Sequence, residues 1–525
     1  MPKVLISDKM SPLAEQVFKQ KNIIADVKTG LSSQELQQII GEYDGLAIRS
    51  ATNVTNDVVA KANNLKVIGR AGIGVDNVDI NAATDKGIIV MNTPFGNSIT
   101  TAEHAIAMMF AVARKIPQAS HSTHLGKWEK SKFMGVELTG KTLGIIGCGN
   151  IGAIVAKKSL GLQMKVLSYD PFLTEEKANA LNIQKVTLDK LLELSDFITL
   201  HVPLNDATRN ILNHDTLSKA KKGVYIINCA RGGLVSEQAL KDGLDSGHIA
   251  GAALDVFEVE PAKENILFGH EKVVMTPHLG ASTKEAQENV AVQVAEQIAN
   301  FLNDNVIENS LNIPSVSPED AKLLKPYILL GEQMGDFIGQ IMENPIKEIN
   351  ITYHGAVTKL NTKPITANII KNILARVIEG VNIVNSKKIA EKRGIIIKDI
   401  ISNEISNYNT YININIVTEK RTRSISGTLF ANEPRIIKIN DVRLEASMST
   451  NMLYISNQDK PGLIGEVGKL LGSKNINIAN FHLGRTPNGS EDAIALIAID
   501  SELNEETLNI IREMPSVIQA KTLRF

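Results

Sequence analysis

Residues 142–152, TLGIIGCGNIG, join an apolar run to three glycines spaced as G-x-G-x-x-G. The apolar run predicts a buried strand, and the residues after it predict the start of a helix. In that context Gly147 permits a tight turn, Gly149 lets a pyrophosphate approach the backbone, and Gly152 lets the helix pack closely on the strand. The spacing alone also fits an ordinary glycine turn, so the strand and helix around it carry the prediction of a dinucleotide site.

An acidic residue follows at the distance that such a site requires. The next apolar run, KVLSYD, ends at Asp170, close to the position about 20 residues on at which a carboxylate accepts the ribose hydroxyls of NAD. The 2′-phosphate of NADP would meet the same carboxylate, and a repulsion at about 4 Å costs roughly 4 kcal/mol at an effective dielectric constant near 20. Pro171 comes next rather than an arginine, so we predict NAD as the cofactor.

Outward from this stretch, short apolar segments alternate with helical patterns from Lys3 to about Pro277, which predicts parallel α/β layers. Residues 101–126 are helix-like and too long for an ordinary crossover, so we expect them to connect two lobes. A second long helical pattern at 282–304 would return the chain to the first lobe. We therefore predict an α/β protein that begins with two Rossmann-like lobes, each a doubly wound parallel sheet.

A change of pattern at 312–318, NIPSVSP, predicts a domain boundary. Beyond it, strictly alternating segments such as YININIVTE predict an antiparallel sheet in an α+β domain. From Asn451 the order strand, helix, strand, strand, helix, strand is ferredoxin-like. The expected domains are a discontinuous lobe at 1–98 and 284–313, a nucleotide-binding lobe at 99–283, an intervening domain at 314–449 and a small domain at 450–525.

The overall composition excludes several classes of partner. Lysines and arginines number 56 against 57 acidic residues, a net charge of -1 that supports neither nucleic-acid nor anionic-membrane binding. The two cysteines, Cys148 and Cys229, both lie inside motifs, which suits a reducing cytosol. The chain reaches Asp8 before any apolar run of signal-peptide length, no segment is long enough to span a bilayer, and no metal motif is present. We expect a cytoplasmic protein.

Three polar residues follow apolar segments where strands are expected to end. Arg231 follows YIINCA, Glu260 lies in DVFEVEP, and His278 follows VVMTP. Doubly wound sheets bind ligands at the carboxyl ends of their strands, so we expect the three side chains in one crevice. A guanidinium beside a buried strand is costly unless an anion meets it. Gly232 and Gly233 follow Arg231 and predict an open approach of a ligand to the backbone.

Oxidation of a hydroxy acid uses all three groups. A base takes the hydroxyl proton as hydride leaves, a neighbour orients that base, and a cation fixes the carboxylate and polarises the oxygen. We predict His278 as the base, Glu260 as its partner and Arg231 as the cation. Taken singly, each has a simpler interpretation, because His278 also fits a capping or core histidine and Glu260 a solvated loop.

Taken in order, GCGNIG, NCARGG, ALDVFEVEP and TPHLGAST resemble the D-2-hydroxyacid dehydrogenases, and closely the long-form phosphoglycerate dehydrogenase branch of that family. The resemblance covers essentially the whole chain. It implies the same three catalytic residues and the oxidation of D-3-phosphoglycerate to 3-phosphohydroxypyruvate, the first step of phosphorylated L-serine biosynthesis. It also implies that Asp255 faces the nicotinamide carboxamide, among cofactor contacts from Asn150, Ile151, Asp170, Val202, Cys229, Ala230, Asp255 and Gly280.

Two arginines of the first lobe each follow an apolar strand: Arg49, before Ser50, and Arg70, in GRAGIGVDN. Two further cations near a carboxylate site suggest a second anion on the substrate, and Arg suits phosphate. Ordinary surface arginines are the alternative. The resemblance implies that Arg49 and Arg70 hold the phosphate of a phosphorylated hydroxy acid. It also implies that the loop 72–77, with Gly72, Gly74, Val75 and Asn77, receives the carboxylate on backbone N–H groups.

The segment 127–133, KWEKSKF, holds the only tryptophan, Trp128. In the family this region lies at a dimer interface and supplies a cation to the neighbouring active site, so a homo-oligomer, a dimer or the tetramer usual for the family, is expected. Ser131 thins the basic run, which leaves a solvated charged loop as the alternative for Lys130 and Lys132.

The last domain resembles an ACT regulatory domain. Asp459, before an expected helix, and Asn477, before the next strand, match effector-binding positions of serine-inhibited relatives, and we expect both near the start of that helix. Helix capping and turn formation explain the same residues. Asn457 replaces a histidine often found there, so inhibition by L-serine is a hypothesis.

Three alternative functions remain open at this point. A relative that acts on hydroxypyruvate or glyoxylate would not need Arg49 and Arg70. A formate dehydrogenase would pair its histidine with glutamine, where this sequence has Glu260. A nucleotide-sensing scaffold similar to the C-terminal-binding corepressors would share the fold without turnover, although the ACT-like tail argues against it.

Overall fold

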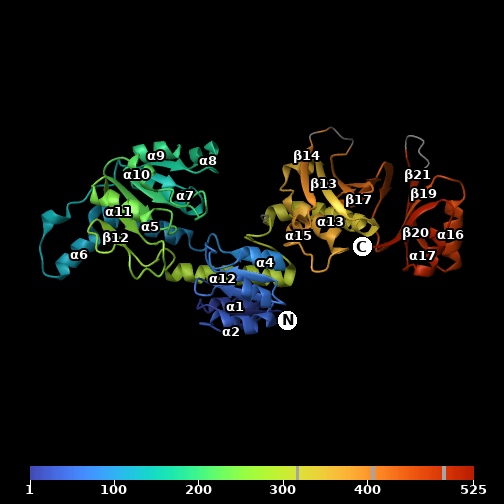
Figure 1. Ribbon diagram of the computed structural model, residues 1–525, viewed down its shortest axis with the longest axis horizontal. Coiled ribbons are helices and arrows are strands. Elements are labelled where there is room, and N and C mark those ends of the chain that lie inside the picture. The colour runs from blue at the N-terminus through green and yellow to red at the C-terminus, as the bar shows by residue number, and fades with distance from the viewer. Residues whose placement is uncertain (315–317, 403, 405–407, 487–491) are drawn as a thin grey trace.

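The computed structural model describes residues 1–314, 318–402, 404, 408–486 and 492–525. Its strands form sheets of five, seven, six and four strands, and each sheet is the centre of one part of the chain. We call these parts, in chain order, the first lobe, the second lobe, the intervening domain and the C-terminal domain. Figure 1 shows an elongated molecule in which the first lobe lies between the second lobe and the intervening domain.

The first lobe is a parallel sheet in the order β2-β1-β3-β4-β5. Strands β3 and β5 are buried along their whole length, as expected for a parallel sheet covered on both faces. The sequence pattern missed β2, because this edge strand is partly exposed and lacks an apolar run. The elements are β1 (Lys3–Ile6), α1 (Leu13–Gln20), β2 (Ile24–Val27), α2 (Ser33–Ile39), η1 (Ile40–Glu42), β3 (Gly45–Ile48), α3 (Asn56–Lys61), β4 (Val67–Arg70), α4 (Ile80–Lys86) and β5 (Ile89–Asn92).

The second lobe is a parallel sheet in the order β12-β11-β10-β9-β6-β7-β8. The chain enters at β6, builds outward to β8, and then returns to build β9 to β12 on the other side. Ligands bind at the carboxyl ends of strands where the order reverses, here between β6 and β9. The elements are α5 (Ser98–Arg114), α6 (Ile116–His124), η2 (Lys130–Phe133), β6 (Thr142–Ile146), α7 (Asn150–Gly161), β7 (Lys165–Tyr169), α8 (Glu175–Ala180), β8 (Gln184–Lys185), α9 (Leu188–Leu194), β9 (Phe197–Leu200), α10 (His214–Ser218), β10 (Val224–Asn228), α11 (Glu237–Asp245), β11 (Ile249–Leu254) and β12 (Val273–Met275).

Two long helices, α5 and α12 (Lys284–Asp304), carry the chain between the lobes. The expected helix at 101–126 is in fact two, because the chain breaks at Lys115, which adopts a left-handed φ of 51°. Helix α12 packs on the first lobe through Val294 and Ile298. A Cβ on Gly69 of β4 would lie 2.6 Å from both side chains, so this glycine lets the helix lie directly on the sheet.

The intervening domain has a mixed sheet in the order β14-β13-β15-β16-β17-β18. The alternating segments form antiparallel neighbours as predicted, whereas β14, which the sequence pattern did not reveal, is parallel to β13. In the sequence, helices α14 and α15 come between these two strands. Such a helical crossover brings the chain back so that the second strand runs in the same direction as the first. The elements are α13 (Pro318–Ile341), β13 (Ile346–Gly355), η3 (Ala356–Lys359), α14 (Lys363–Ala375), α15 (Ser386–Lys392), β14 (Ile396–Ser402), β15 (Thr410–Thr418), β16 (Thr422–Phe430), β17 (Glu433–Ile439) and β18 (Val442–Ala446).

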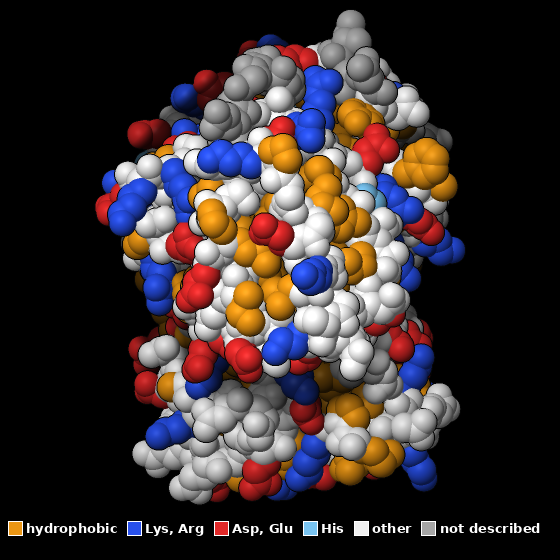
Figure 2. Space-filling view, turned by 90° about the vertical axis from the view of Figure 1, so that its right-hand side faces the viewer, with side chains coloured by type: hydrophobic (Ala, Val, Ile, Leu, Met, Phe, Trp, Pro, Cys, Tyr) orange, Lys and Arg blue, Asp and Glu red, His pale blue; other side chains and the backbone are white. Residues whose placement is uncertain are grey.

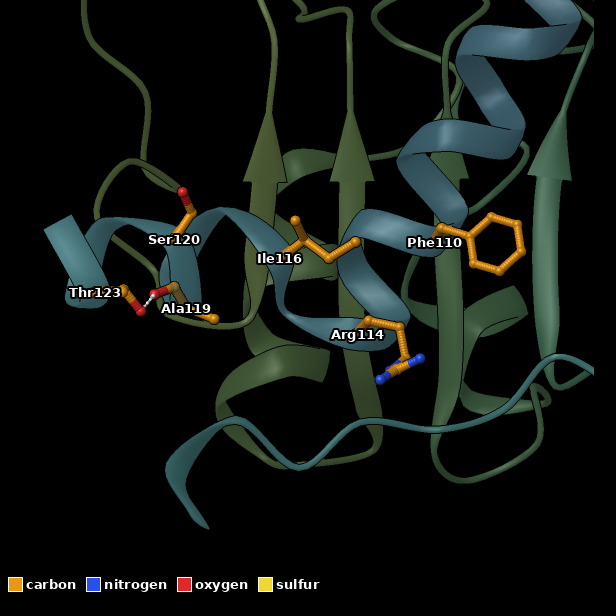
Figure 3. Close-up of a pocket in the computed structure, with 6 residues that line it drawn as sticks. All are labelled: Phe110, Arg114, Ile116, Ala119, Ser120 and Thr123. Carbon is orange, nitrogen blue, oxygen red and sulfur yellow. Dashed lines mark hydrogen bonds between the residues drawn. The ribbon is translucent and has the colours of Figure 1, made fainter. Parts of the chain in front are cut away.

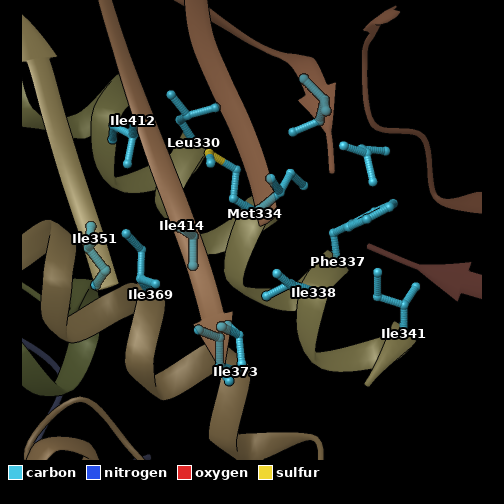
Figure 4. Packing of buried hydrophobic residues seen from close by; sticks show 14 of the residues in the cluster. Leu330, Met334, Phe337, Ile338, Ile341, Ile351, Ile369, Ile373, Ile412 and Ile414 are labelled. Carbon is cyan, nitrogen blue, oxygen red and sulfur yellow. The ribbon is translucent and has the colours of Figure 1, made fainter. Parts of the chain in front are cut away.

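The core of the intervening domain is built from isoleucines on alternate positions. Ile412, Ile414 and Ile416 of β15 are all fully buried, in the same cluster as residues of α13 and α14 (Figure 4). Helices α13 and α14 meet closely, because a Cβ on Gly335 would lie 2.7 Å from the carbonyl oxygen of Ile369. The strict alternation therefore predicts the buried face of the sheet correctly. It does not predict the direction of the edge strand β14, which depends on the helices that precede it.

The C-terminal domain is an antiparallel sheet in the order β20-β21-β19-β22, with the predicted ferredoxin-like order of elements. One face of the sheet is covered by its two helices, and the other joins the core of the intervening domain, where the Phe337 and Tyr454 rings meet edge to face at 5.8 Å. Figure 2 views the molecule from this end, with hydrophobic side chains gathered in the middle of the face. The elements are β19 (Asn451–Gln458), α16 (Leu463–Ser473), β20 (Ile478–Arg485), β21 (Asp492–Ile499), α17 (Glu505–Arg512) and β22 (Val517–Arg524).

The intervening domain is also attached to the first lobe. Asp85 of α4 pairs with Lys388 and Lys392 of α15, both at 2.9 Å. Val384, just before α15, is 6% exposed and belongs to the core cluster of the first lobe, and Asn382 donates to the carbonyl of Gly87 at 2.9 Å. Throughout the described residues, no helix combines the length and apolar character needed to cross a membrane.

Candidate active site

Arg231, Glu260 and His278 lie at the carboxyl ends of neighbouring strands. Arg231 follows β10, Glu260 lies in the loop after β11, and His278 follows β12. Because these three strands are adjacent in the sheet, their ends meet at one edge. The structure therefore brings the three side chains together, close enough for the charge of Arg231 to act on both Glu260 and His278.

His278 and Glu260 form a hydrogen-bonded pair, with 2.7 Å between Nδ1 and Oε2. The other oxygen of Glu260 accepts the N–H of Phe257 at 3.0 Å, which fixes the carboxylate. His278 adopts a left-handed φ of 54°, and its N–H donates to the carbonyl of Asp255 at 2.9 Å. A backbone conformation so unusual for a residue other than glycine is held by its surroundings.

The pair is arranged to be charged. The hydrogen bond to Glu260 raises the pKa of His278 and outweighs burial, which acts in the opposite direction. Burial raises the pKa of Glu260, but the hydrogen bonds from His278 and the Phe257 N–H more than offset it, and this pKa is lowered. Since Nδ1 is committed to Glu260, Nε2 is the ring nitrogen that is left to exchange a proton.

Arg231 is held by one contact in each lobe. Its Nη1 donates to the carbonyl oxygen of Ala230 at 2.7 Å, in the second lobe. Its Nε donates to Asp76 at 3.0 Å, in the first lobe. The expectation that the glycines after Arg231 open the backbone to a ligand was wrong for Gly232. A Cβ there would lie 1.7 Å from the carbonyl oxygen of Phe257, so Gly232 makes room for the segment that carries Glu260.

The three glycines after β6 have the geometry of a dinucleotide loop. Gly147 has a φ of +94°, and a Cβ would lie 2.5 Å from Val202 and 2.6 Å from the carbonyl oxygen of His201. A Cβ on Gly152 would lie 2.1 Å from the carbonyl oxygen of Gly147, so α7 packs directly on the turn. A Cβ on Gly149, by contrast, would meet no described atom within 4 Å, which leaves its backbone open to a ligand.

Asp170 lies beside this loop. It follows β7 and accepts the N–H of Cys148 at 2.8 Å and the N–H of Phe172 at 2.7 Å. Asn150 begins α7, the helix whose amino end faces the loop, and Ile151 follows it. An open glycine backbone, a helix start and a fixed carboxylate together fit the pyrophosphate and ribose of NAD.

Asp255, expected at the nicotinamide, is completely buried. Its carboxylate accepts from the Thr276 hydroxyl at 2.5 Å, from the N–H groups of Leu279 and Gly280 at 2.7 and 2.8 Å, and lies 3.2 Å from Nε2 of His104. It therefore anchors the segment that carries His278. His104 was missed, although a single histidine in the apolar pattern TAEHAIAMM was the available signal. Cys229 is buried and Ala230 partly buried at the end of β10.

Arg49 and Arg70 lie at the ends of β3 and β4. Burial lowers the pKa of Arg70 to about 10, helped by repulsion from Arg231, and its Nε has no hydrogen-bond partner in the described part of the chain. The N–H of Arg49 donates to Asp8 at 2.6 Å, so Asp8, another residue that the sequence did not reveal, fixes this strand end. Ser50 is exposed next to Arg49.

The expectation that the loop 72–77 receives a carboxylate on its N–H groups stays a prediction, except at Gly72. The N–H of Gly72 already donates to the Thr93 hydroxyl at 2.6 Å. A Cβ on Gly72 would lie 1.7 Å from Nη1 of Arg70, and one on Gly74 the same distance from Nη2 of Arg231, so both glycines make room for guanidinium groups. Asn77 donates to the carbonyls of Arg49 and Thr52, and the carbonyl of Val75 accepts the Val78 N–H at 2.9 Å.

The chain is similar over its whole length to curated D-3-phosphoglycerate dehydrogenases. It is 40% identical over 525 residues to that of Bacillus subtilis, which covers 100% of this chain and 99% of the relative. It is 42% identical over 395 residues to that of Homo sapiens, 75% of this chain and 74% of the relative.

The chain belongs to the D-3-phosphoglycerate dehydrogenase family.

Three family descriptions divide the chain as this membership requires. Residues 106–280 match the D-isomer specific 2-hydroxyacid dehydrogenase NAD binding domain, 323–440 the D-3-phosphoglycerate dehydrogenase intervening domain, and 451–515 the ACT domain. A crystal structure from Thermus thermophilus is 31% identical, with a TM-score of 0.55 over 59% of this chain and 99% of its own. The D-lactate dehydrogenase of Escherichia coli is 27% identical, with a TM-score of 0.53 over 59% of this chain and 100% of its own.

The predicted family, fold class and cofactor are thereby confirmed, and the chain is an NAD-dependent oxidoreductase. The C-terminal domain is an ACT domain of the D-3-phosphoglycerate dehydrogenase family. Within the described residues, no cluster of three or more His, Cys, Asp or Glu side chains is arranged to hold a metal ion.

The two expected effector residues of the ACT domain are far apart. Asp459 precedes α16, whereas Asn477 follows its end, so the expectation that both lie near the helix start was wrong for Asn477. A helix of this length separates them by about 16 Å. Asp459 lies 3.2 Å from Nε of Arg485, and the Asn477 amide donates to Asp500 at 2.8 Å. One ACT domain therefore does not bring both to one small ligand.

An apolar surface lies on α5, α6 and the loop after them. The side chain of Trp128 is 82% exposed, Met134 77% and Ile116 52%. Beside it, a groove of about 460 Å³ is lined by Phe110, Arg114, Ile116, Ala119, Ser120 and Thr123 (Figure 3). Lys130 and Lys132 are exposed in η2.

Proposed function

We propose that the chain oxidises D-3-phosphoglycerate to 3-phosphohydroxypyruvate with NAD, as the first step of the phosphorylated route to L-serine. The observation that carries the proposal is Arg70. A guanidinium whose pKa is lowered by burial, with an unpartnered Nε and a second guanidinium beside it, is stabilised by an anion. A substrate with a carboxylate at one end and a phosphate at the other provides an anion for each arginine.

In this proposal the residues of the second lobe carry the proton chemistry. The Gly147–Gly152 loop and Asp170 would hold the pyrophosphate and ribose of NAD, which would supply the acceptor for the hydride from C2 of the substrate. His278 takes the C2 hydroxyl proton at Nε2, and Glu260 holds the resulting imidazolium through Nδ1. Arg231 binds the substrate carboxylate and the C2 oxygen, where it stabilises the developing charge.

The first lobe positions the other end of the substrate. Arg49 and Arg70 bind the phosphate, because a guanidinium matches phosphate oxygens with two parallel hydrogen bonds. Ser50 adds a hydroxyl beside Arg49. Gly72 and Gly74 contribute by leaving room for the arginine side chains, and Val75 and Asn77 shape the loop that carries them.

The test is NADH oxidation with 3-phosphohydroxypyruvate beside hydroxypyruvate, glyoxylate and 2-oxoglutarate at equal concentration. We expect the phosphorylated acid to lead by at least roughly a hundredfold in kcat/KM, about 2.7 kcal/mol of transition-state binding. A faster unphosphorylated acid would instead support a hydroxypyruvate or glyoxylate reductase. Binding of NADH without turnover of any acid would support a nucleotide-sensing scaffold.

We further propose that L-serine or another small effector binds the ACT domain at Asp459, by the amino end of α16, with Asn477 contributed by a second chain. Assays with 3-phosphohydroxypyruvate, with and without millimolar serine, test this. We expect serine to slow turnover by the wild-type chain and to leave turnover by Asp459→Ala unchanged. Unchanged turnover together with no calorimetric heat of serine binding would exclude serine as the effector.

The proposal includes a homo-oligomer, a dimer or tetramer, in the cytoplasm. The apolar surface around Trp128 and the groove beside it support the association, and two buried free cysteines suit a reducing compartment. Light scattering of the wild-type chain and of Trp128→Ala measures the oligomer. Lys130→Ala and Lys132→Ala then show whether either lysine contributes to activity, since loss of kcat/KM in a normal oligomer would assign it a role.

A further inference from the structure

We propose that Asp76 is a positioning residue that holds Arg231 in its working orientation from across the crevice. The inference rests on the role of Arg231 in the proposed function and adds a residue that the proposed reaction does not itself require. Asp76 belongs to the first lobe and Arg231 to the second, 155 residues apart in sequence. Their contact, 3.0 Å between Oδ2 and Nε, joins the two walls of the crevice.

The orientation follows from the three nitrogens of the guanidinium. Nε is bound to Asp76 and Nη1 to the carbonyl of Ala230 at 2.7 Å, which fixes the plane of the group. Nη2 lies over Gly74, where a Cβ would come within 1.7 Å of it. Asp76 and Gly74 stand two residues apart on one loop, so one residue attracts the guanidinium and the other leaves room for it.

Electrostatics explains why a carboxylate is useful at this point. Arg231 repels Arg70, and this repulsion adds to burial in lowering the pKa of Arg70, while Asp76 acts in the opposite direction. Asp76 therefore lies where its charge attracts both cations. Without it, and without substrate, repulsion would favour movement of the Arg231 side chain away from the crevice.

The contact affects the orientation of the Arg231 side chain rather than the stability of the fold. The Asp76 side chain is 73% exposed and that of Arg231 28%, so solvent screens the attraction and the pair contributes little to the folding free energy. Catalysis is more sensitive, because a cation that stabilises a developing oxyanion must lie within a fraction of an ångström of its place. Because the partners belong to different lobes, Arg231 is oriented only when the lobes are close.

The experiment compares Asp76→Ala and Asp76→Asn with Asp57→Ala, which removes an exposed carboxylate of α3 in the same lobe. In reduction of 3-phosphohydroxypyruvate, we expect Asp76→Ala to lower kcat by at least about tenfold while KM changes less than about threefold. Asp76→Asn should lose less than Asp76→Ala but remain below wild type, because an amide oxygen still accepts the Nε hydrogen but carries no charge to attract the guanidinium. Asp57→Ala should match wild type, and NADH affinity should be the same in all four proteins.

Three results would overturn the proposal. They are an unchanged kcat in Asp76→Ala, an equal loss in Asp76→Ala and Asp76→Asn, or a rise in KM alone, which would mean a contact with substrate. If Asp76→Ala melts well below wild type, Asp76→Ser replaces it in the same comparison. If wild type prefers hydroxypyruvate, the substrate proposal fails and the comparison is made with that acid.

A crystal structure of Asp76→Ala without substrate is the readout that needs no turnover. Displacement of the Arg231 guanidinium from its place over Gly74 supports the proposal, and an unmoved guanidinium contradicts it. This result stands even if wild type reduces none of the acids, an outcome that would refute the proposed function alone.

Discussion

The loop 147–152 of the second lobe and the loop 72–77 of the first lobe begin with the same G-x-G pattern, GCG and GIG, each after a buried parallel strand. In the second lobe the second glycine of the pattern is open, since a Cβ on Gly149 would meet nothing within 4 Å. In the first lobe the same addition to Gly72 or Gly74 would collide with an arginine. One loop thus offers its backbone to a ligand, whereas the other receives cationic side chains.

The difference separates two ways of binding an anion. In the proposed function the loop 147–152 would bind its anion through N–H groups and a helix start, so its specificity would be set by backbone shape. The loop 72–77 would instead act through Arg70 and Arg231, which come from different lobes and meet over its glycines. Substitutions in the loop 147–152 should therefore change NADH affinity, and substitutions in the loop 72–77 should change turnover of the acid.

Gly74→Ala should have the largest effect. The new Cβ would lie 1.7 Å from Nη2 of Arg231 and must displace it, so we expect kcat to fall roughly 100- to 1000-fold, as for loss of an oxyanion-stabilising donor. Steady-state kinetics and NADH fluorescence titration measure it, and NADH affinity should be unchanged. Gly161→Ala, at an open position of α7, is the control. Normal turnover in Gly74→Ala would remove Arg231 from its proposed role.

Arg70→Ala should lower kcat/KM for 3-phosphohydroxypyruvate by about a hundredfold, close to 2.7 kcal/mol, because a charged hydrogen-bonded contact to phosphate is lost. Reduction of hydroxypyruvate, which lacks the phosphate, should change much less. Parallel kinetics with the two acids decide the matter. Equal losses on both would assign Arg70 to the carboxylate or to the fold.

Gly149→Ala should raise the Kd of NADH by about tenfold without lowering the melting temperature, because the added methyl group meets only the ligand. Gly152→Ala is the counterpart, since its Cβ would lie 2.1 Å from a backbone oxygen and should destabilise the fold by roughly 1–3 kcal/mol. Calorimetry and fluorescence titration distinguish them. A destabilised Gly149→Ala would contradict the open position of this residue.

Glu260→Gln should shift a pH profile. Glu260 raises the pKa of His278, which keeps the imidazolium available for reduction as pH rises. The amide lowers that pKa, so reduction should be lost at lower pH than in wild type, while oxidation, which needs neutral imidazole, should begin at lower pH. The kcat/KM of both directions is measured between pH 5 and 10. A basic limb that does not move would exclude Glu260 as the histidine's partner.

How far the sequence predicts this molecule depends on how local each feature is. The strand, glycine loop and Asp170 of the nucleotide site lie within one short unit, so spacing predicts their geometry. Asp76 and Arg231 meet only after two lobes fold, and no local pattern marks that contact. The direction of β14 and the distance between Asp459 and Asn477 were missed for a related reason, because both depend on where a helix carries the chain.

The seat of Val384 in the first lobe, with Asp85 between two lysines, has a mechanical consequence. The intervening domain and the ACT domain share one hydrophobic core, and Val384 attaches the intervening domain to the separate core of the first lobe. The second lobe, by contrast, is joined to the first lobe through α5 and α12. If the lobes separate to admit a substrate, these contacts predict that the second lobe moves while the first lobe keeps its attachment to the intervening domain.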